Sequence, residues 1–175
     1  RKSGLLPPSA GQTNQSGTEF KLPYYWNIAP NVDATVTPRI MSRRGLQINQ
    51  EFRYLSKMLS STVRTEYLGN DDLVNDSRWA YVLAQQYSWG QKLSANISLQ
   101  SVSDDSYFTD LSDNINATSL TNLPRELGIN YDGGWYSAGL RIQNFRTLQD
   151  PRNLVTPPYQ RVPQFRLFGT KKLNI

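Results

Sequence analysis

Polar side chains that recur at alternate positions are the residues of this sequence best placed to do chemistry. Six of them carry a cationic or amide group: Lys21, Arg39, Arg53, Arg64, Arg141 and Gln143. Because successive side chains of a β-strand point to opposite faces, such residues share one face of a sheet and can receive a polar, negatively charged molecule. Glu51 and Glu66 belong to the same pattern, so ordinary Arg–Glu pairs that only solvate this face fit equally well.

The sequence offers little for catalysis or for metal binding. It contains no cysteine and no histidine, which removes thiolates, the commonest general base and the commonest metal ligand. The paired acids Asp71–Asp72 and Asp104–Asp105 lie between turn-forming residues, so we expect solvated turns at both places. No motif of the common hydrolases, zinc enzymes or nucleotide-binding proteins occurs. We therefore predict a protein that is not an enzyme and needs no cofactor.

The composition favours thin-walled β-structure over a thick apolar core. Hydrophobic residues make up 38% of the 175 residues, below the usual ~45–50%, yet the chain holds 10 Tyr, 6 Phe and 4 Trp. The net charge of +5 is modest for this length, and we expect no nucleic-acid partner. No run of ~18 apolar residues predicts a transmembrane helix, although barrel strands cross membranes without such a run.

The elements that position the polar residues show a period of two. Apolar and polar residues alternate most clearly in residues 46–54, 92–100 and 135–143. We count about ten such strands of about eight to twelve residues, longer than the globular mode of ~5–6. A tilted strand that crosses a membrane needs ~9–11 residues. The predicted class is all-β: an antiparallel transmembrane β-barrel, of which this chain forms a part.

The connections between these strands support a barrel. One set is short: Asn27–Asn31, Leu55–Met58, Trp89–Gln91 and Asp132–Gly134. We expect the alternate set to contain the long loops Gly11–Gly17, Gly69–Ser77, Ser103–Asn122 and Gln149–Pro158. Ser42–Gly45 is the short exception in this set. Short periplasmic turns opposite long external loops are typical of outer-membrane barrels. Tyr and Trp residues near the short turns also favour an aromatic girdle over the general preference of strands for aromatic residues.

Several prolines fall within or beside the predicted strands: Pro7, Pro8, Pro23, Pro38 and Pro163. Proline has no N–H group, so it removes a hydrogen bond from a β-ladder and is usually found at edges or bulges. These prolines mark either strand ends or a deliberately weak seam between strands.

Five stretches of the sequence form a distinctive series: Leu22-Pro-Tyr-Tyr-Trp-Asn-Ile-Ala-Pro-Asn31, Asp33-Ala-Thr-Val-Thr-Pro-Arg39, Met41-Ser-Arg-Arg-Gly-Leu-Gln47, Glu51-Phe-Arg-Tyr-Leu55 and Pro158-Tyr-Gln-Arg-Val-Pro-Gln164. Together they resemble the LptD family of lipopolysaccharide assembly proteins. The resemblance implies that residues 1–175 are the N-terminal part of a large outer-membrane barrel of a Gram-negative bacterium. Pro7 and Pro23 match family prolines that weaken a lateral gate in the barrel wall, and Pro8 is an additional proline beside them.

The same resemblance implies a function and a set of partners. Lipopolysaccharide would leave the barrel through the lateral gate and enter the outer leaflet. An LptE-like lipoprotein would plug the lumen, a periplasmic domain preceding the barrel would meet the Lpt bridge, and the barrel-assembly machinery would fold the protein. The chain lacks the family's cysteines. Two alternatives remain: a soluble carbohydrate-binding β-sandwich, and a partially folded barrel held by the assembly machinery.

Overall fold

A single antiparallel sheet accounts for most of the chain in the computed structural model, which describes residues 2–112, 121–149 and 154–170. In chain order the elements are β1 (Gly4–Leu5), β2 (Ser9–Thr13), β3 (Gly17–Lys21), β4 (Tyr24–Ala29), β5 (Val32–Met41), β6 (Gly45–Leu55), β7 (Leu59–Asp71), β8 (Asp76–Trp89), β9 (Leu93–Val102), α1 (Tyr107–Leu111), β10 (Asn122–Asp132), β11 (Tyr136–Thr147) and β12 (Arg161–Gly169). The all-β prediction is therefore confirmed for the described residues.

The strands form an up-and-down meander. From β4 to β12 each strand pairs with the next strand in sequence, and β1 and β2 lie along the first edge. β3 and β4 pair with β5 in one continuous register, so they are two halves of one strand, and β1 and β2 form the strand beside them. The twelve strands therefore occupy ten positions across the sheet, which agrees with the expected number of strands.

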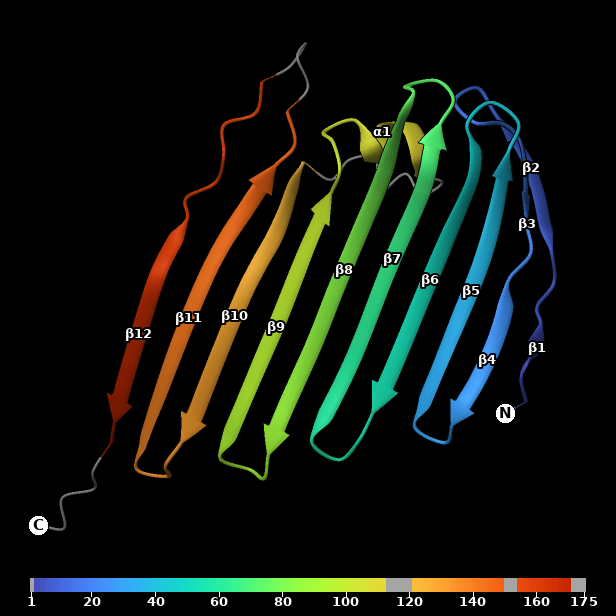
Figure 1. The fold of residues 1–175 in the computed structure, drawn as a ribbon. Coiled ribbons are helices and arrows are strands. Elements are labelled where there is room, and N and C mark those ends of the chain that lie inside the picture. Colours follow the sequence, from blue (N-terminus) through green and yellow to red (C-terminus); the bar gives the residue numbers. More distant parts are fainter. Residues whose placement is uncertain (1, 113–120, 150–153, 171–175) are drawn as a thin grey trace, which may run out of the picture.

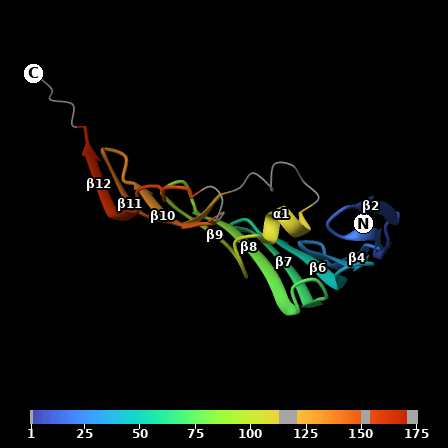
Figure 2. The same ribbon diagram turned by 90° about the horizontal axis from the view of Figure 1, so that it is seen from above.

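The sheet is curved and open. Figure 1 shows the strands side by side, with β12 at one edge and β1 and β2 at the other. Figure 2, seen from above, shows both edges turned toward the same side, with α1 on the concave side near β7 and β8. The described residues form no second sheet packed against the first, so they do not build the two-sheet sandwich considered above.

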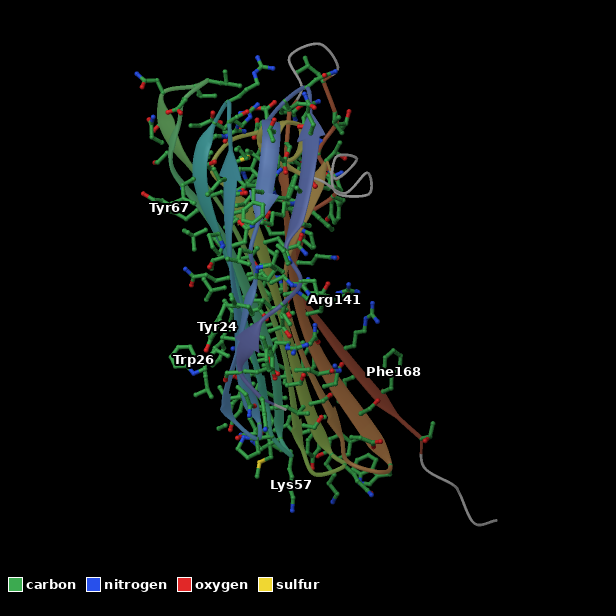
Figure 3. All side chains as sticks on the ribbon, turned by 90° about the vertical axis from the view of Figure 1, so that its right-hand side faces the viewer. Tyr24, Trp26, Lys57, Tyr67, Arg141 and Phe168 are labelled. Carbon is green, nitrogen blue, oxygen red and sulfur yellow. The ribbon has the colours of Figure 1, made fainter. Side chains whose placement is uncertain are left out.

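The two faces of the sheet differ in chemistry. One row of paired residues runs across six strands as Trp26, Ala34, Phe52, Val63, Leu83 and Leu99. The next row, on the opposite face, runs Asp33, Arg53, Thr62, Ala84, Ser98 and Glu126. We call these the apolar face and the polar face. Trp26 is 52% exposed, and in Figure 3 Tyr24, Trp26 and Tyr67 project from the side opposite to Arg141.

The connections are sorted by length between the two ends of the sheet. At the turn end, residues 30–31, 56–58, 90–92 and 133–135 make the four short turns that the sequence predicts. At the loop end, 103–121 and 148–160 are long, as expected. The prediction of long loops at Gly11–Gly17 and Gly69–Ser77 was wrong, because the strands continue to Thr13 and Asp71 and leave only 14–16 and 72–75 between them.

Local hydrogen bonds explain why the connections 14–16 and 72–75 are short. Ser16 N donates to Thr13 Oγ1, while Leu73 N donates to Asp71 Oδ1 and Asn75 N to Asp71 O. Asn75 adopts a φ of 60°, which a tight turn requires and asparagine tolerates. Polar residues that suggest a long loop in the sequence therefore close tight hairpins.

The connection between β9 and β10 contains a helix that the sequence analysis did not predict. Tyr107 and Leu111 of α1 pack with Met41, Leu68, Ala80 and Val102 and are among the buried hydrophobic residues of the chain. The packing of an otherwise thin sheet is thus concentrated where α1 meets its concave side. No helix among the described residues has the length and apolar character needed to span a membrane.

Candidate functional site

All six polar residues singled out from the sequence lie on the polar face. Lys21 and Arg39 are direct cross-strand partners near the loop end, and Arg53 and Arg64 lie on the neighbouring strands β6 and β7. Arg141 and Gln143 follow each other on the same face of β11. The register thus brings these residues together in three places and not in one cluster.

Each of these places pairs its cations with carboxylates. Arg53 Nε and Nη2 donate to the Asp33 carboxylate at 2.7 and 2.9 Å, and Arg64 Nε donates to Glu51 Oε2 at 2.6 Å. Arg141 Nη2 and Gln143 Nε2 share Glu126 Oε2 at 2.9 and 3.2 Å. The Arg53 and Arg64 side chains are 44% and 61% exposed, so these two pairs contribute only about 0.2–1 kcal/mol of stability each.

Arg39 has a different environment, because it is only 3% exposed. Its Nε and Nη2 donate to the two carboxylate oxygens of Glu19 at 3.0 and 2.9 Å. Its Nη1 donates to Gln47 Oε1 at 3.1 Å and to the Leu111 carbonyl oxygen at 2.7 Å. Lys21 Nζ lies 3.8 Å from Glu19. A buried charge is tolerated when its donors are satisfied in this way, and the bond to Leu111 fixes the end of α1 on the polar face.

A second buried cluster anchors the start of α1. Arg78, 2% exposed, donates to Asp71 at 3.2 Å, to the Asp104 carboxylate at 2.9 and 2.6 Å and to Asp110 at 2.8 Å. Arg44 donates to the same Asp71 oxygen at 2.5 Å. The expectation of solvated turns was therefore wrong for Asp71, which is completely buried. Asp104 lies in a bend and keeps 39% of its side chain exposed, but its carboxylate also holds the connection after β9 against the sheet through Arg78.

The position of Asp71 could not be read from the alternation of the sequence. The register between β7 and β8 shifts between Leu68 and Asp71, which indicates a bulge. One extra residue in a strand reverses the faces of the residues that follow, so the bulge turns Asp71 toward Arg78.

Tyr107 joins α1 to the middle of the cluster. Its hydroxyl donates to Glu66 Oε2 at 2.7 Å and accepts a hydrogen bond from Gln47 Nε2 at 3.0 Å. Burial raises the pKa of Tyr107 above its usual range, and the neighbouring Glu66 carboxylate raises it further. Partial burial opposes ionisation of Asp104, but hydrogen bonds from Arg78, Ser103 and Ser106 outweigh it and hold the pKa of Asp104 below its usual range. The phenol is therefore neutral and the carboxylate charged at neutral pH.

The polar face is hollowed between β9 and β12. A hollow of about 260 Å³ has Gly128 and Gly139 at its floor and Arg141 and Arg166 at its wall. The Arg141 Nε atom is buried and has no hydrogen-bond partner. The Arg141 side chain is 39% exposed and Arg166 is exposed, so guanidinium groups flank the hollow. The sequence analysis singled out Arg141 but not Arg166.

The candidate gate prolines lie together in the first hairpin. Leu5 pairs with Tyr24 and Ser9 with Lys21, so three residues of one strand, Leu6 to Pro8, stand opposite two of the other, Leu22 and Pro23. Across this break Leu6 N donates to the Pro23 carbonyl oxygen at 2.9 Å. Pro7, Pro8 and Pro23 have no N–H to add further bonds. The breaks in the two neighbouring strands therefore coincide.

The remaining two prolines behave differently. Pro38 lies inside β5 and keeps its register with Ile48 of β6. Pro163 lies in β12, at the register shift between β11 and β12, where a bulge accommodates the missing donor. On its other side Pro38 faces the gap between β3 and β4, where Leu22 N donates to the Pro38 carbonyl oxygen at 3.2 Å, so Pro38 borders the interruption in the first hairpin.

The fold and its two faces define a class of protein. An up-and-down antiparallel sheet with an exposed apolar face, a charge-paired polar face and connections sorted by length is typical of the wall of an outer-membrane barrel. The comparison with known proteins agrees: the family profile of LptD, described as LPS transport system D, matches residues 76–175. The chain belongs to the LptD family.

Individual relatives match almost the whole chain. A protein of Azoarcus sp. (strain BH72) named LPS-assembly protein LptD is 46% identical over 166 residues, which cover 94% of this chain and 20% of that protein. Proteins of the same name from Acidovorax sp. (strain JS42) and Nitrosomonas europaea are 41% and 42% identical; the matches cover 95% and 98% of this chain and 22% and 24% of those proteins. The chain thus spans about a fifth to a quarter of the length of these relatives.

Proposed function

We propose that residues 1–175 form the N-terminal part of an outer-membrane β-barrel that transports lipopolysaccharide and assembles it into the outer leaflet of a Gram-negative cell. The observation that carries this proposal is the two-faced meander in a chain of the LptD family. Exposed Trp26, Phe52 and Tyr67 fit a face that meets lipid. In this arrangement the polar face lines the lumen.

The polar face suits the sugar-phosphate part of the cargo. Because most of its cations are already paired with carboxylates, the face is hydrated and close to neutral, and a charged molecule can slide along it without being trapped. The exposed parts of the Arg141 and Arg166 guanidinium groups beside the hollow can donate to a phosphate or a sugar hydroxyl. At the loop end α1 covers this face through its contacts with Arg39 and Arg78 and through its own Tyr107. Cargo therefore leaves on the turn-end side of α1, sideways through the barrel wall.

The first hairpin provides one side of a lateral gate in this proposal. Pro7, Pro8 and Pro23 interrupt the ladder at one level, so separating the edge strand costs fewer hydrogen bonds there than in an unbroken pair of strands. The acyl chains pass sideways through the opened seam while the anionic sugar stays in the polar lumen. Catalysis has no part in this mechanism, and no cofactor is required.

The test replaces Pro7 and Pro23, the two prolines that match the family pattern, with residues that can donate a hydrogen bond. In the full-length protein, P7V/P23V is expected to tighten the seam and lower the rate at which lipopolysaccharide reaches the cell surface. The matched control is Pro163→Val, a proline at the register shift between β11 and β12 that faces no other proline. Unchanged transport by the double variant, with normal protein levels, contradicts the gate.

The proposal extends to the partners implied by the family. They are an LptE-like lipoprotein as plug of the lumen, the periplasmic Lpt bridge reached through a preceding domain, and the barrel-assembly machinery during folding. Crosslinking from Arg53 and Arg141 on the polar face is expected to capture the lipoprotein, whereas crosslinking from Trp26 on the apolar face is expected not to. The alternative of a partially folded barrel predicts capture of the assembly machinery from all three positions.

A further inference from the structure

Two arginines meet on the apolar face at the loop end of β9 to β11. Arg125 Nη2 donates to Ser101 Oγ at 3.0 Å, and Arg146 Nη1 donates to the same oxygen at 3.1 Å. Arg125 pairs with Leu99 in the ladder, and Ser101 pairs with Tyr81, which place both residues on the apolar face. Two guanidinium groups thus converge on one hydroxyl group outside the polar lumen.

The charges of this pair are poorly compensated. On the polar face, Arg39, Arg53, Arg64, Arg78 and Arg141 each lie 2.6–2.9 Å from a carboxylate oxygen. By contrast, Arg146 lies 3.7 Å from Asp105, whose side chain is 43% exposed, and Arg125 forms no ion pair with any described residue. The Arg125 Nε atom is also buried without a hydrogen-bond partner. Two like charges that share a neutral acceptor repel each other unless an anion joins them.

The β-ladder is incomplete at this point. The ladder between β9 and β10 ends at Leu99 and Arg125, although β9 continues to Val102 and β10 begins at Asn122. Beyond that pair, the strand ends are linked by Arg146, which also donates to the carbonyl oxygens of Val102 and Ser103. An anion held by both guanidinium groups would therefore replace part of the missing ladder.

The depth of the pair on the sheet indicates the kind of anion. Tyr81, the ladder partner of Ser101, stacks on Trp79 with 5.8 Å between the ring centroids, and both rings are on the apolar face near the loop end. Tyr and Trp on a lipid-facing surface gather at headgroup depth. An arginine on such a surface costs about 2–4 kcal/mol at the membrane midplane and about 0–1 kcal/mol near the interface.

We propose that Arg125 and Arg146 form a binding site on the outside of the barrel wall for the phosphate group of an outer-leaflet lipid. This inference rests on the proposed function, because it needs the apolar face to meet lipid. Guanidinium groups match phosphate oxygens with paired hydrogen bonds, so two of them can hold one phosphate from both sides. The bound lipid pins the ends of β9 and β11 together, and Ser101 keeps the two arginines in place before it arrives.

The test uses the full-length protein in its native complex, purified in detergent. Binding of lipid A with two phosphates is measured for the wild type, for R125Q/R146Q and for K57Q/K92Q. The last variant removes the same charge from two exposed lysines in turn-end connections. Dephosphorylated lipid A on the wild type provides a second measurement that does not depend on the stability of a variant.

We expect R125Q/R146Q to bind lipid A at least tenfold more weakly, K57Q/K92Q to bind as the wild type does, and removal of the phosphates to reproduce the loss. Competition by millimolar inorganic phosphate alone would identify free phosphate as the ligand and overturn the lipid assignment. Equal binding of both forms of lipid A by the wild type would overturn the site. The two proposals fail separately: cells that depend on the wild-type protein but place no lipopolysaccharide at their surface would refute transport, whereas equal lipid A binding by the wild type and R125Q/R146Q would refute this site.

Discussion

The hydroxyl group of Tyr107 tests how firmly α1 covers the loop end of the polar face. Tyr107→Phe removes one oxygen atom and keeps the ring, which is 1% exposed. The lost contacts are the 2.7 Å bond to Glu66 and the 3.0 Å bond from Gln47. A hydrogen bond to a charged group contributes about 1.5–3 kcal/mol, so the free energy of local opening of α1 is expected to fall by that amount.

Hydrogen exchange measures this free energy directly. In the reconstituted full-length protein, a loss of 1.5–3 kcal/mol corresponds to roughly 10- to 150-fold faster exchange in peptides covering residues 103–112. These peptides include the amides of Asp110 and Ser112, which are bonded to Ser106 and Phe108 within and beside α1.

The matched control is Tyr159→Phe, since Tyr159 is 86% exposed and its hydroxyl is expected to contribute nothing to α1. Exchange that changes by less than threefold in Tyr107→Phe would refute the reasoning, because the hydroxyl would then contribute less than about 0.7 kcal/mol.

Three further predictions concern pH, a turn and the buried charges. Folding lowers the pKa of Asp104, so its contribution to stability is complete above its unfolded pKa of about 3.9. This contribution is lost as the pH falls through the pKa of the folded state. Cleavage of the 103–121 connection by an acid-active protease should therefore rise in that pH range. Gly17→Ala, at a φ of 73°, should lower the free energy of unfolding by about 1–2 kcal/mol, whereas Gly11→Ala, with open space around it, should change it little in denaturant titrations. In the same titrations, Arg78→Gln should lower the free energy of unfolding by about 3–5 kcal/mol, because it leaves buried carboxylates unpaired. Arg64→Gln, at an exposed position, should lower it by less than about 1 kcal/mol.

The alternation of residues was sufficient to predict the sheet and its faces. In residues 92–100, for example, the apolar set beginning at Leu93 lies on the apolar face and the intervening polar residues on the polar face. The shared face of Arg53, Arg64 and Arg141 followed from the same rule, because the side-chain period of a strand is two and the register is regular through these strands.

The features that the sequence did not predict depend on contacts between distant segments. Asp71 changes face at a bulge, and Asp104 is held by Arg78, 26 residues away in the chain. The short helix α1 is fixed by Tyr107 and Leu111 against strands β5 to β8, and five residues alone carry no clear helical period. The bridging of Ser101 by two arginines likewise arises where the β9–β10 ladder stops, which alternation does not reveal.

The effect of the prolines on the strands could be predicted only in part. Their lack of an N–H group predicts an interruption in the strands, and the first hairpin is interrupted at Pro7, Pro8 and Pro23. Whether a strand-internal proline breaks the register depends on its partner strand, and Pro38 leaves the pairing with β6 intact. The gate itself stays a proposal.

The central claim is that the apolar face of this sheet meets lipid and the polar face meets water. Phe52 and Arg53 are consecutive residues of β6 on opposite faces, so spin labels at these two positions of the full-length protein in lipid bilayers test it most directly. We expect the label at position 52 to collide with dissolved oxygen and to be shielded from a water-soluble nickel complex, with the reverse at position 53. Equal access of the nickel complex to both labels would contradict it.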